Sequence, residues 1–296
     1  MKTSLRKAGY VLLPLVAYVV VHDITRIILM YIVSIIAGTS STVYVYIADH
    51  DAIFSGVMAI IEMAAGTAVL LFMMKRDGWE LSIWDYVNLN GISFYRADKL
   101  HKTWVSYAVL VIQAISAAIG LNALLYLTGI AKNPSAYDGA GGKSYSLPLL
   151  FGVIMYGFIS PAVEELLHRI IIFGRMKRCY PYVVSVIVSS FFFGLYHQNL
   201  VQMIYGTLMG ILMCLACEYI HTILGAFIVH SLANITVYIL GYIGVFSSMG
   251  TVRICVICLV IAALTLIWEG VSSFRSAHIV GVPYGVDKVG LFFVDE

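Results

Sequence analysis

Residues 146–174, SLPLLFGVIMYGFISPAVEELLHRIIIFG, form an apolar segment with charged side chains in its second half. At about 1.5 Å per residue, a helix of this length crosses the roughly 30 Å hydrocarbon core of a bilayer. Glu164, Glu165 and Arg169 then lie where an ionisable group is costly, so each needs a partner, water or a function. The segment therefore predicts a membrane helix that carries a polar site.

The composition of the whole chain agrees with this interpretation. Of its 296 residues, 61% are hydrophobic and only 11% are charged, whereas soluble domains carry about 25% charged residues. We expect an all-α, polytopic membrane bundle that forms one transmembrane helical domain over residues 1–296. The expected spans are eight, the fifth of them short: 9–36, 52–74, 104–130, 146–174, 182–197, 199–219, 222–245 and 252–270.

The basic residues predict the orientation of these spans. Thirteen of the 18 Lys and Arg residues fall on one side, three fall on the other and two lie inside spans. Because cytoplasmic loops are enriched in Lys and Arg, both termini are expected in the cytoplasm. Residues 75–103 then form a cytoplasmic loop whose aromatic and basic residues suit the membrane interface, although an ordinary connecting loop fits equally well.

The spacing of the charged residues assigns them different roles. Glu165 and Arg169 are four residues apart, so they share a helical face and suit an ion pair. Glu164 points about 100° away from Glu165 and has no evident cation partner. A carboxylate without a cation needs a hydrated pocket, and such a group suits general-base catalysis.

Three further polar residues occur in the following spans. His197 ends the fifth span, and we expect the junction 197–199 to lie within the bilayer and face a cavity. His230 and Asn234 are four residues apart and share one face, where an imidazole and an amide can stabilise an oxyanion. Each group alone would suit interhelical hydrogen bonding. Together, in sequential spans, they predict one polar chamber within a core of about residues 146–245.

The same residues carry a family resemblance. The chain resembles the CPBP intramembrane proteases, the group that includes eukaryotic CAAX prenyl endopeptidases and bacterial Abi proteins. It contains the three motifs of that family complete and in order: Glu164-Glu165-x3-Arg169, Phe193-x3-His197 and His230-x3-Asn234. One departure is His168, where the family often has an aromatic residue; it lies one turn from Glu164 and either tunes the pocket or packs.

The resemblance implies peptide-bond hydrolysis inside the membrane. It gives Glu164 the role of activating water with the help of His197. It gives His230 and Asn234 the oxyanion hole, and it leaves the pair of Glu165 and Arg169 as support or as a contact for the end of the substrate.

A zinc-dependent version of the protease is the first alternative. Glu164, His197 and His230 make a His₂Glu set, which is a catalytic zinc constellation. No HExxH motif pre-organises two ligands, so we favour a mechanism without a cofactor and keep zinc as the alternative. The cysteine pairs 214/217 and 255/258 match zinc-ribbon spacing, but they lie in apolar helix without turn residues, so we reject that site.

Other classes of function are a membrane scaffold or bacteriocin-immunity protein, and a transporter. A scaffold tends to lose motif residues, whereas this chain keeps all of them, and no inverted repeat supports a transporter. The expected partners are the lipid bilayer and a peptide or protein substrate that is membrane-associated or lipidated, with no nucleic acid. We expect an integral multi-pass membrane protein, located in the plasma membrane if the host is bacterial.

Overall fold

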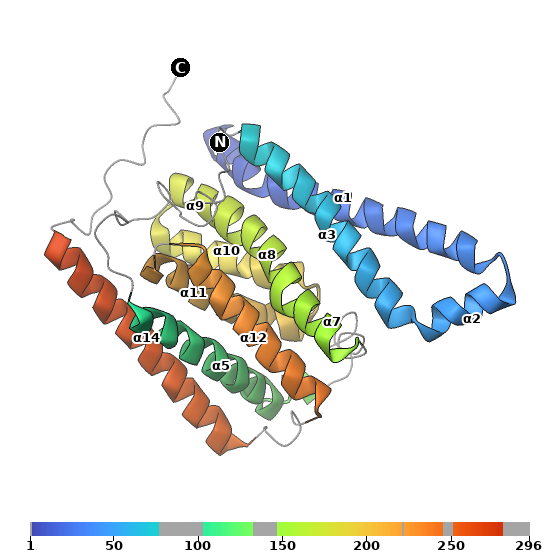
Figure 1. Ribbon diagram of the computed structural model, residues 1–296. Helices are drawn as coiled ribbons and strands as arrows, with labels where there is room; N and C mark the ends of the chain where they lie inside the picture. Colours follow the sequence, from blue (N-terminus) through green and yellow to red (C-terminus); the bar gives the residue numbers. More distant parts are fainter. Residues whose placement is uncertain (1, 77–102, 133–146, 221, 245–250, 281–296) are drawn as a thin grey trace.

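The protein is a bundle of membrane-length helices (Figure 1). The computed structural model describes residues 2–76, 103–132, 147–220, 222–244 and 251–280. Within these ranges all regular elements are helical, so the prediction of an all-α, polytopic fold is confirmed. Most of the loop 75–103 lies outside the described residues.

Seven described helices are long and apolar enough to cross a membrane, and one apolar helix is shorter. The short one is α10 (Tyr182–Tyr196), which corresponds to the expected short fifth span. The others are α1 (Lys2–Ala37), α3 (Asp51–Arg76), α5 (Trp104–Leu127), the continuous helix Leu149–Cys179, α11 (Leu200–Ile220), α12 (Leu224–Tyr242) and α14 (Val252–Val280). The expected spans therefore each have a helical counterpart.

The helix that carries the two glutamates is not uniformly α-helical. It consists of α7 (Leu149–Ile154), the π-helical turn η4 (Met155–Ile159), α8 (Ser160–Glu165), the π-helical turn η5 (Leu166–Phe173) and α9 (Gly174–Cys179). The sequence predicted one membrane span over residues 146–174. Pro follows the first π-helical turn at position 161, and a proline removes a backbone donor and clashes with the preceding turn, which favours a local change of winding. All residues of η5 are buried, so this helix lies at the centre of the bundle.

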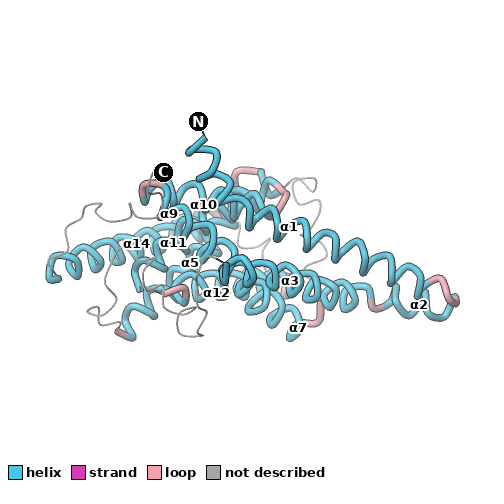
Figure 2. Tube along the Cα trace, turned by 90° about the horizontal axis from the view of Figure 1, so that it is seen from above, coloured by secondary structure: helices cyan, strands magenta, loops and turns pink. Residues whose placement is uncertain are grey.

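The connection between α1 and α3 also differs from the prediction. A short helix, α2 (Ser41–Asp49), joins them, and the Ser40 side chain caps it by accepting a hydrogen bond from the Val43 N–H at 3.1 Å. Both views place α2 at the far end of the α1–α3 pair, away from the other helices (Figures 1 and 2).

The N-terminal part of α1 and the basic helix α9 lie at the same end of the bundle (Figure 1). Arg175 donates a hydrogen bond to the Tyr10 carbonyl oxygen, and its guanidinium lies 4.4 Å from the centre of the Tyr10 ring. Arg178 donates to the Tyr10 hydroxyl at 3.3 Å. Basic segments that are far apart in the sequence therefore lie at one end of the bundle. A cytoplasmic surface is expected to gather such residues. The orientation in the membrane stays a prediction.

Glycines allow α10 and α11 to approach closely beside the expected site. A Cβ on Gly206 would lie 3.1 Å from the Gly194 Cα, and a Cβ on Gly210 would lie 2.9 Å from the Ser190 Cβ. The spacing Gly206-x3-Gly210 thus packs α11 against α10, as small residues four apart do in membrane bundles. Gly194 is the tightest of these three glycines, because a Cβ there would lie 2.3 Å from the Met203 carbonyl oxygen.

We expect Gly194→Ala to separate α10 from α11 and to destabilise the folded protein by about 1–3 kcal/mol, the usual cost of overpacking. Its thermal midpoint in detergent would fall accordingly, as followed by tryptophan fluorescence. Gly9→Ala is the matched control, since a Cβ at Gly9 meets nothing within 4 Å. Equal midpoints for the two variants would contradict the close approach of these helices.

Candidate active site

Glu164 lies on α8, where one carboxylate oxygen is held and the other faces another helix. Its Oε1 accepts a hydrogen bond from the Ser160 hydroxyl, one turn earlier on the same helix. Its Oε2 lies 3.6 Å from Nε2 of His230 on α12 and has no hydrogen-bond partner among the described residues. The side chain is buried. The Glu164 carboxylate is therefore buried and held at Oε1, while Oε2 is available to bind water or substrate.

The expected ion pair between Glu165 and Arg169 is present. Arg169 Nε lies 3.1 Å from Glu165 Oε2, and both side chains are completely buried. The guanidinium also donates to the Met213 sulfur at 3.4 Å and lies 4.7 Å from the centre of the Phe193 ring. A buried charge without a partner would be costly, so this pair fixes η5 relative to α10 and α11.

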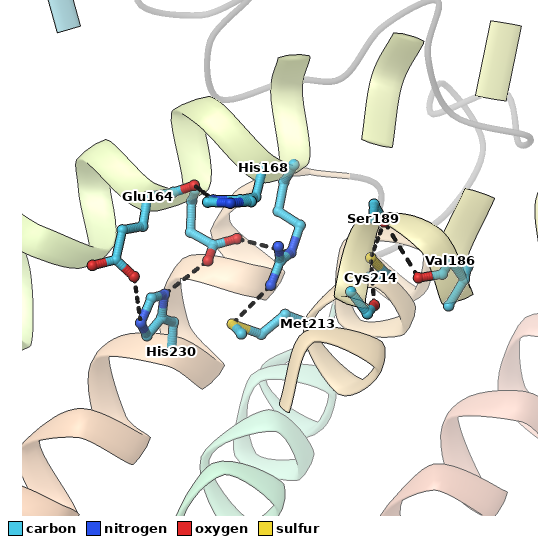
Figure 3. A network of polar contacts seen from close by, with 10 residues as sticks. Glu164, His168, Val186, Ser189, Met213, Cys214 and His230 are labelled. Carbon is cyan, nitrogen blue, oxygen red and sulfur yellow. Dashed lines mark hydrogen bonds and ion pairs between the residues drawn. The ribbon is translucent and has the colours of Figure 1, made fainter. Parts of the chain in front are cut away.

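His230 connects the two glutamates. Its Nδ1 lies 2.7 Å from Glu165 Oε1, while its Nε2 faces Glu164 (Figure 3). A carboxylate only accepts, so the Nδ1–H donates to Glu165. The sequence placed His230 with Asn234 on one face but gave no partner for the ring. The structure adds this partner and so fixes the orientation of the imidazole.

Asn234 lies one turn after His230 on α12. Its Nδ2 donates to the Tyr156 carbonyl oxygen at 3.0 Å, and Tyr156 belongs to the π-helical turn η4. Helix α12 therefore binds the helix Leu149–Cys179 at two positions, through His230 and through Asn234. One of the two N–H groups of the amide is used in this bond, and a carboxamide carries a second one.

His197 follows α10 directly and belongs to the same aromatic cluster as His230. Its Nδ1 lies 3.0 Å from the Phe193 carbonyl oxygen, which assigns the ring proton to Nδ1 and leaves a lone pair on Nε2. The Phe193 ring makes edge contacts with both imidazoles, at centroid distances of 5.2 Å to His197 and 5.3 Å to His230. The structure thus places both predicted histidines in contact with the Phe193 ring.

His168 is fully buried and packs rather than facing an open pocket. Its ring lies between Phe193 and Tyr196, at centroid distances of 5.1 and 5.5 Å. Its Nδ1 lies 3.0 Å from the main-chain oxygen of Glu164 and donates to it. Of the two roles that the sequence left open for His168, the geometry favours packing beside the site.

The donor types of Glu164, His197 and His230 suit zinc, but their placement does not gather them as a ligand set. Among the described residues, no group of three or more His, Cys, Asp or Glu side chains is positioned to hold a metal ion. Nδ1 of each histidine contacts an oxygen, a main-chain oxygen in His197 and a carboxylate in His230, so only Nε2 of each ring could bind a metal. In this arrangement Glu164 and His230 face each other directly.

Sequence reasoning missed two residues of this site. Ser160 binds Glu164, and the signal was its position four residues earlier on the same helical face. Phe193 was noted only as a motif letter, although its ring touches three imidazoles and the Arg169 guanidinium. The spacing of four residues accounts for the contact with His197, but no spacing rule reveals the contacts with His168, Arg169 and His230, which come from other helices.

The comparison with protein families agrees with this site. Residues 146–236 match the family model described as "Rce1-like: Type II CAAX prenyl endopeptidase Rce1-like". This part of the chain is similar to that family. The match covers α8, α10 and α11 entirely, and it includes all six residues predicted for the site. No curated protein and no solved structure matches the chain.

The Rce1-like match supports the CPBP/CAAX group of intramembrane proteases, which the sequence motifs had predicted. Members of this group are endopeptidases that work within a membrane, and the seven membrane-length helices fit that setting. The protein is an integral, multi-pass membrane protein, and the family implies a peptide or protein substrate.

We expect Glu165→Gln to destabilise the protein by about 3–5 kcal/mol, because the buried Arg169 guanidinium would lose its anionic partner. The loss would be measured as a lower thermal midpoint in detergent. The double variant Glu165→Gln/Arg169→Met removes both charges and is expected to regain much of that stability. A double variant less stable than the single one would contradict the argument that the unpaired charge is the cost.

Proposed function

We propose that the protein is an intramembrane endopeptidase in which Glu164 activates water without a metal ion. One observation carries the proposal: Glu164 is enclosed, its Oε1 is held by Ser160, and its Oε2 faces His230 without a hydrogen bond. A carboxylate held in this way suits a general base, because its geometry toward a bound water is already set.

In the proposed first step, Glu164 Oε2 removes a proton from a water molecule whose oxygen attacks the carbonyl carbon of the scissile peptide. His197 helps to hold this water, since the lone pair on its Nε2 accepts a hydrogen bond from the other O–H of the water. The carbonyl oxygen becomes an oxyanion. In the second step the C–N bond breaks as Glu164 returns the proton to the leaving amine, which yields a carboxylic acid and an amine.

His230 and Asn234 are the proposed donors to the oxyanion. Glu165 holds His230 through Nδ1, so Nε2 is the nitrogen that faces Glu164 and donates when it carries a proton. The second N–H of the Asn234 amide supplies another donor. Donors fixed before the reaction stabilise a developing charge strongly in a low-dielectric site.

The proposed substrate is a protein segment that reaches the membrane, and the description of the matched family points to a lipidated C-terminus. A prenyl chain would place its peptide at the bilayer, where the site lies among apolar helices. The probe for this proposal is an internally quenched fluorescent peptide that ends in a farnesylated Cys-aliphatic-aliphatic-X sequence. The same peptide without the farnesyl group tests whether the lipid is needed.

We expect Glu164→Gln to lower kcat on this peptide by about 10²- to 10⁴-fold, the usual contribution of a general base. The assay uses purified protein in proteoliposomes. Glu269→Gln is the control, because Glu269 is also a buried carboxylate but belongs to α14, outside the family match. Full activity in Glu164→Gln would refute the glutamate mechanism, whereas no cleavage by the wild-type protein would favour a scaffold role.

Removal of metal ions separates the two versions of the mechanism. We expect exhaustive dialysis against a membrane-permeant chelator to leave kcat unchanged, since the described site does not gather a ligand set. Loss of activity that returns on addition of zinc would establish the zinc-dependent alternative with Glu164, His197 and His230 as ligands.

A further inference from the structure

Helix α1 carries two exposed charges in the middle of a membrane-length segment. After Lys7, Asp23 and Arg26 are the only Asp, Glu, Lys or Arg residues of α1. Asp23 lies near the middle of the apolar segment Arg6–Ala37. The Asp23 side chain is 52% exposed, and Arg26 is exposed as well. Charged groups at this depth usually face the interior of a bundle and pair with one another. The exposed carboxylate therefore indicates a surface that another protein covers.

Contacts within the chain satisfy only part of these charges. His22 Nδ1 lies 3.0 Å from Asp23 Oδ1, and His22 Nε2 lies 3.6 Å from Oε2 of Glu62, a buried residue of α3. Within the part of the chain that the structure describes, neither Asp23 Oδ2 nor Arg26 makes a hydrogen bond or an ion pair. One carboxylate oxygen and one guanidinium per chain are therefore available to a partner.

The exposed side of α1 has the spacing of a coiled-coil seam. Its residues follow one another at alternating intervals of three and four, and we call them the α1 seam: Leu13, Val16, Val20, Asp23, Ile27, Met30 and Ser34. Helices with this heptad spacing pack along a left-handed crossing, which is also the usual geometry in membrane bundles. The buried residues Val11, Pro14 and Tyr18 lie on the opposite side of α1. Packing within the chain thus leaves the α1 seam uncovered, at the flank of the bundle (Figures 1 and 2).

The α1 seam is complementary to itself. Copies of one membrane protein share an orientation in the bilayer, so a twofold axis along the membrane normal places α1 parallel to the same helix of a second copy. Asp23 then lies in the contact between the two helices, and Arg26 flanks it, as charged residues flank the seam of a coiled coil. Two carboxylates and two guanidinium groups balance in charge, whereas the hydrocarbon of the bilayer supplies no counter-charge.

We propose that the α1 seam is the docking surface for a second copy of this chain, in which Asp23 pairs with the partner's Arg26. A polar residue in an otherwise apolar seam fixes the register of two helices, and Asp23 takes this role. The residues of the candidate active site come from helices other than α1, so the inference does not depend on the catalytic mechanism.

Reversal of single charges tests the pairing. Full-length copies that carry a donor or an acceptor fluorophore are reconstituted in phosphatidylcholine liposomes, and energy transfer is followed as lipid is added. We expect the wild type to associate. Asp23→Arg or Arg26→Asp should weaken association by about tenfold or more, because each variant brings like charges together at the interface. A mixture of the two variants restores opposite charges, so we expect it to associate about as strongly as the wild type.

Three outcomes would overturn the proposal. Wild-type chains that stay monomeric at every lipid dilution would show that lipid or a different protein covers the α1 seam. Single variants that associate like the wild type would place the contact elsewhere. A mixture that does not associate, although wild-type thermal midpoints show that both variants fold, would exclude the pairing of Asp23 with the partner's Arg26.

Oxidative cross-linking tests the α1 seam without a change of charge. Ile27 and Ile28 are neighbouring exposed residues of α1, but only Ile27 belongs to the seam. A disulfide needs Cα atoms within about 7 Å of each other. We therefore expect Ile27→Cys to give a covalent dimer in native membranes and Ile28→Cys to give no more than the wild type, whose α1 contains no cysteine. Equal yields from the two variants would overturn the inference, whereas Glu164→Gln tests the proposed function separately.

Discussion

The geometry of the site depends on one buried network, in which Arg169, Glu165 and His230 neutralise and orient one another. The guanidinium and the carboxylate cannot stay charged in an apolar interior unless they meet, and they meet at 3.1 Å. The remaining carboxylate oxygen then holds the imidazole at 2.7 Å. The ion pair of Glu165 and Arg169 thereby positions His230 of α12. It also determines that Nε2 of the His230 ring faces Glu164.

The three imidazoles around Phe193 share a second constraint. Each uses Nδ1 for a contact with an oxygen: His168 with Glu164, His197 with Phe193 and His230 with Glu165. The first two oxygens are main-chain carbonyls one turn earlier, so α-helical geometry alone supplies them. Only His230 takes a carboxylate from another helix. This difference separates His230 from the other two histidines and gives it its place beside the glutamates.

Close packing around the site explains how short α10 reaches it. Gly194 and Gly206 bring α10 against α11, so His197 stays within the bundle although its helix ends at Tyr196. The next residue, Gln198, adopts a left-handed conformation with φ 58°, which turns the chain into α11. The tight helix pair also places His197 beside α11, where its Nδ1 would lie 3.6 Å from a Cβ on Gly206.

The sequence by itself determined the spans, the helical class and the ion pair of Glu165 with Arg169, because apolar length and a spacing of four residues act within one segment. It also indicated which residue types would carry the chemistry. Only the tertiary structure decided that His230 binds Glu165 and that Asn234 binds the main chain of η4. Spacing fixes which face a side chain occupies on its own helix. How helices rotate and pack against one another depends on side chains from the whole bundle.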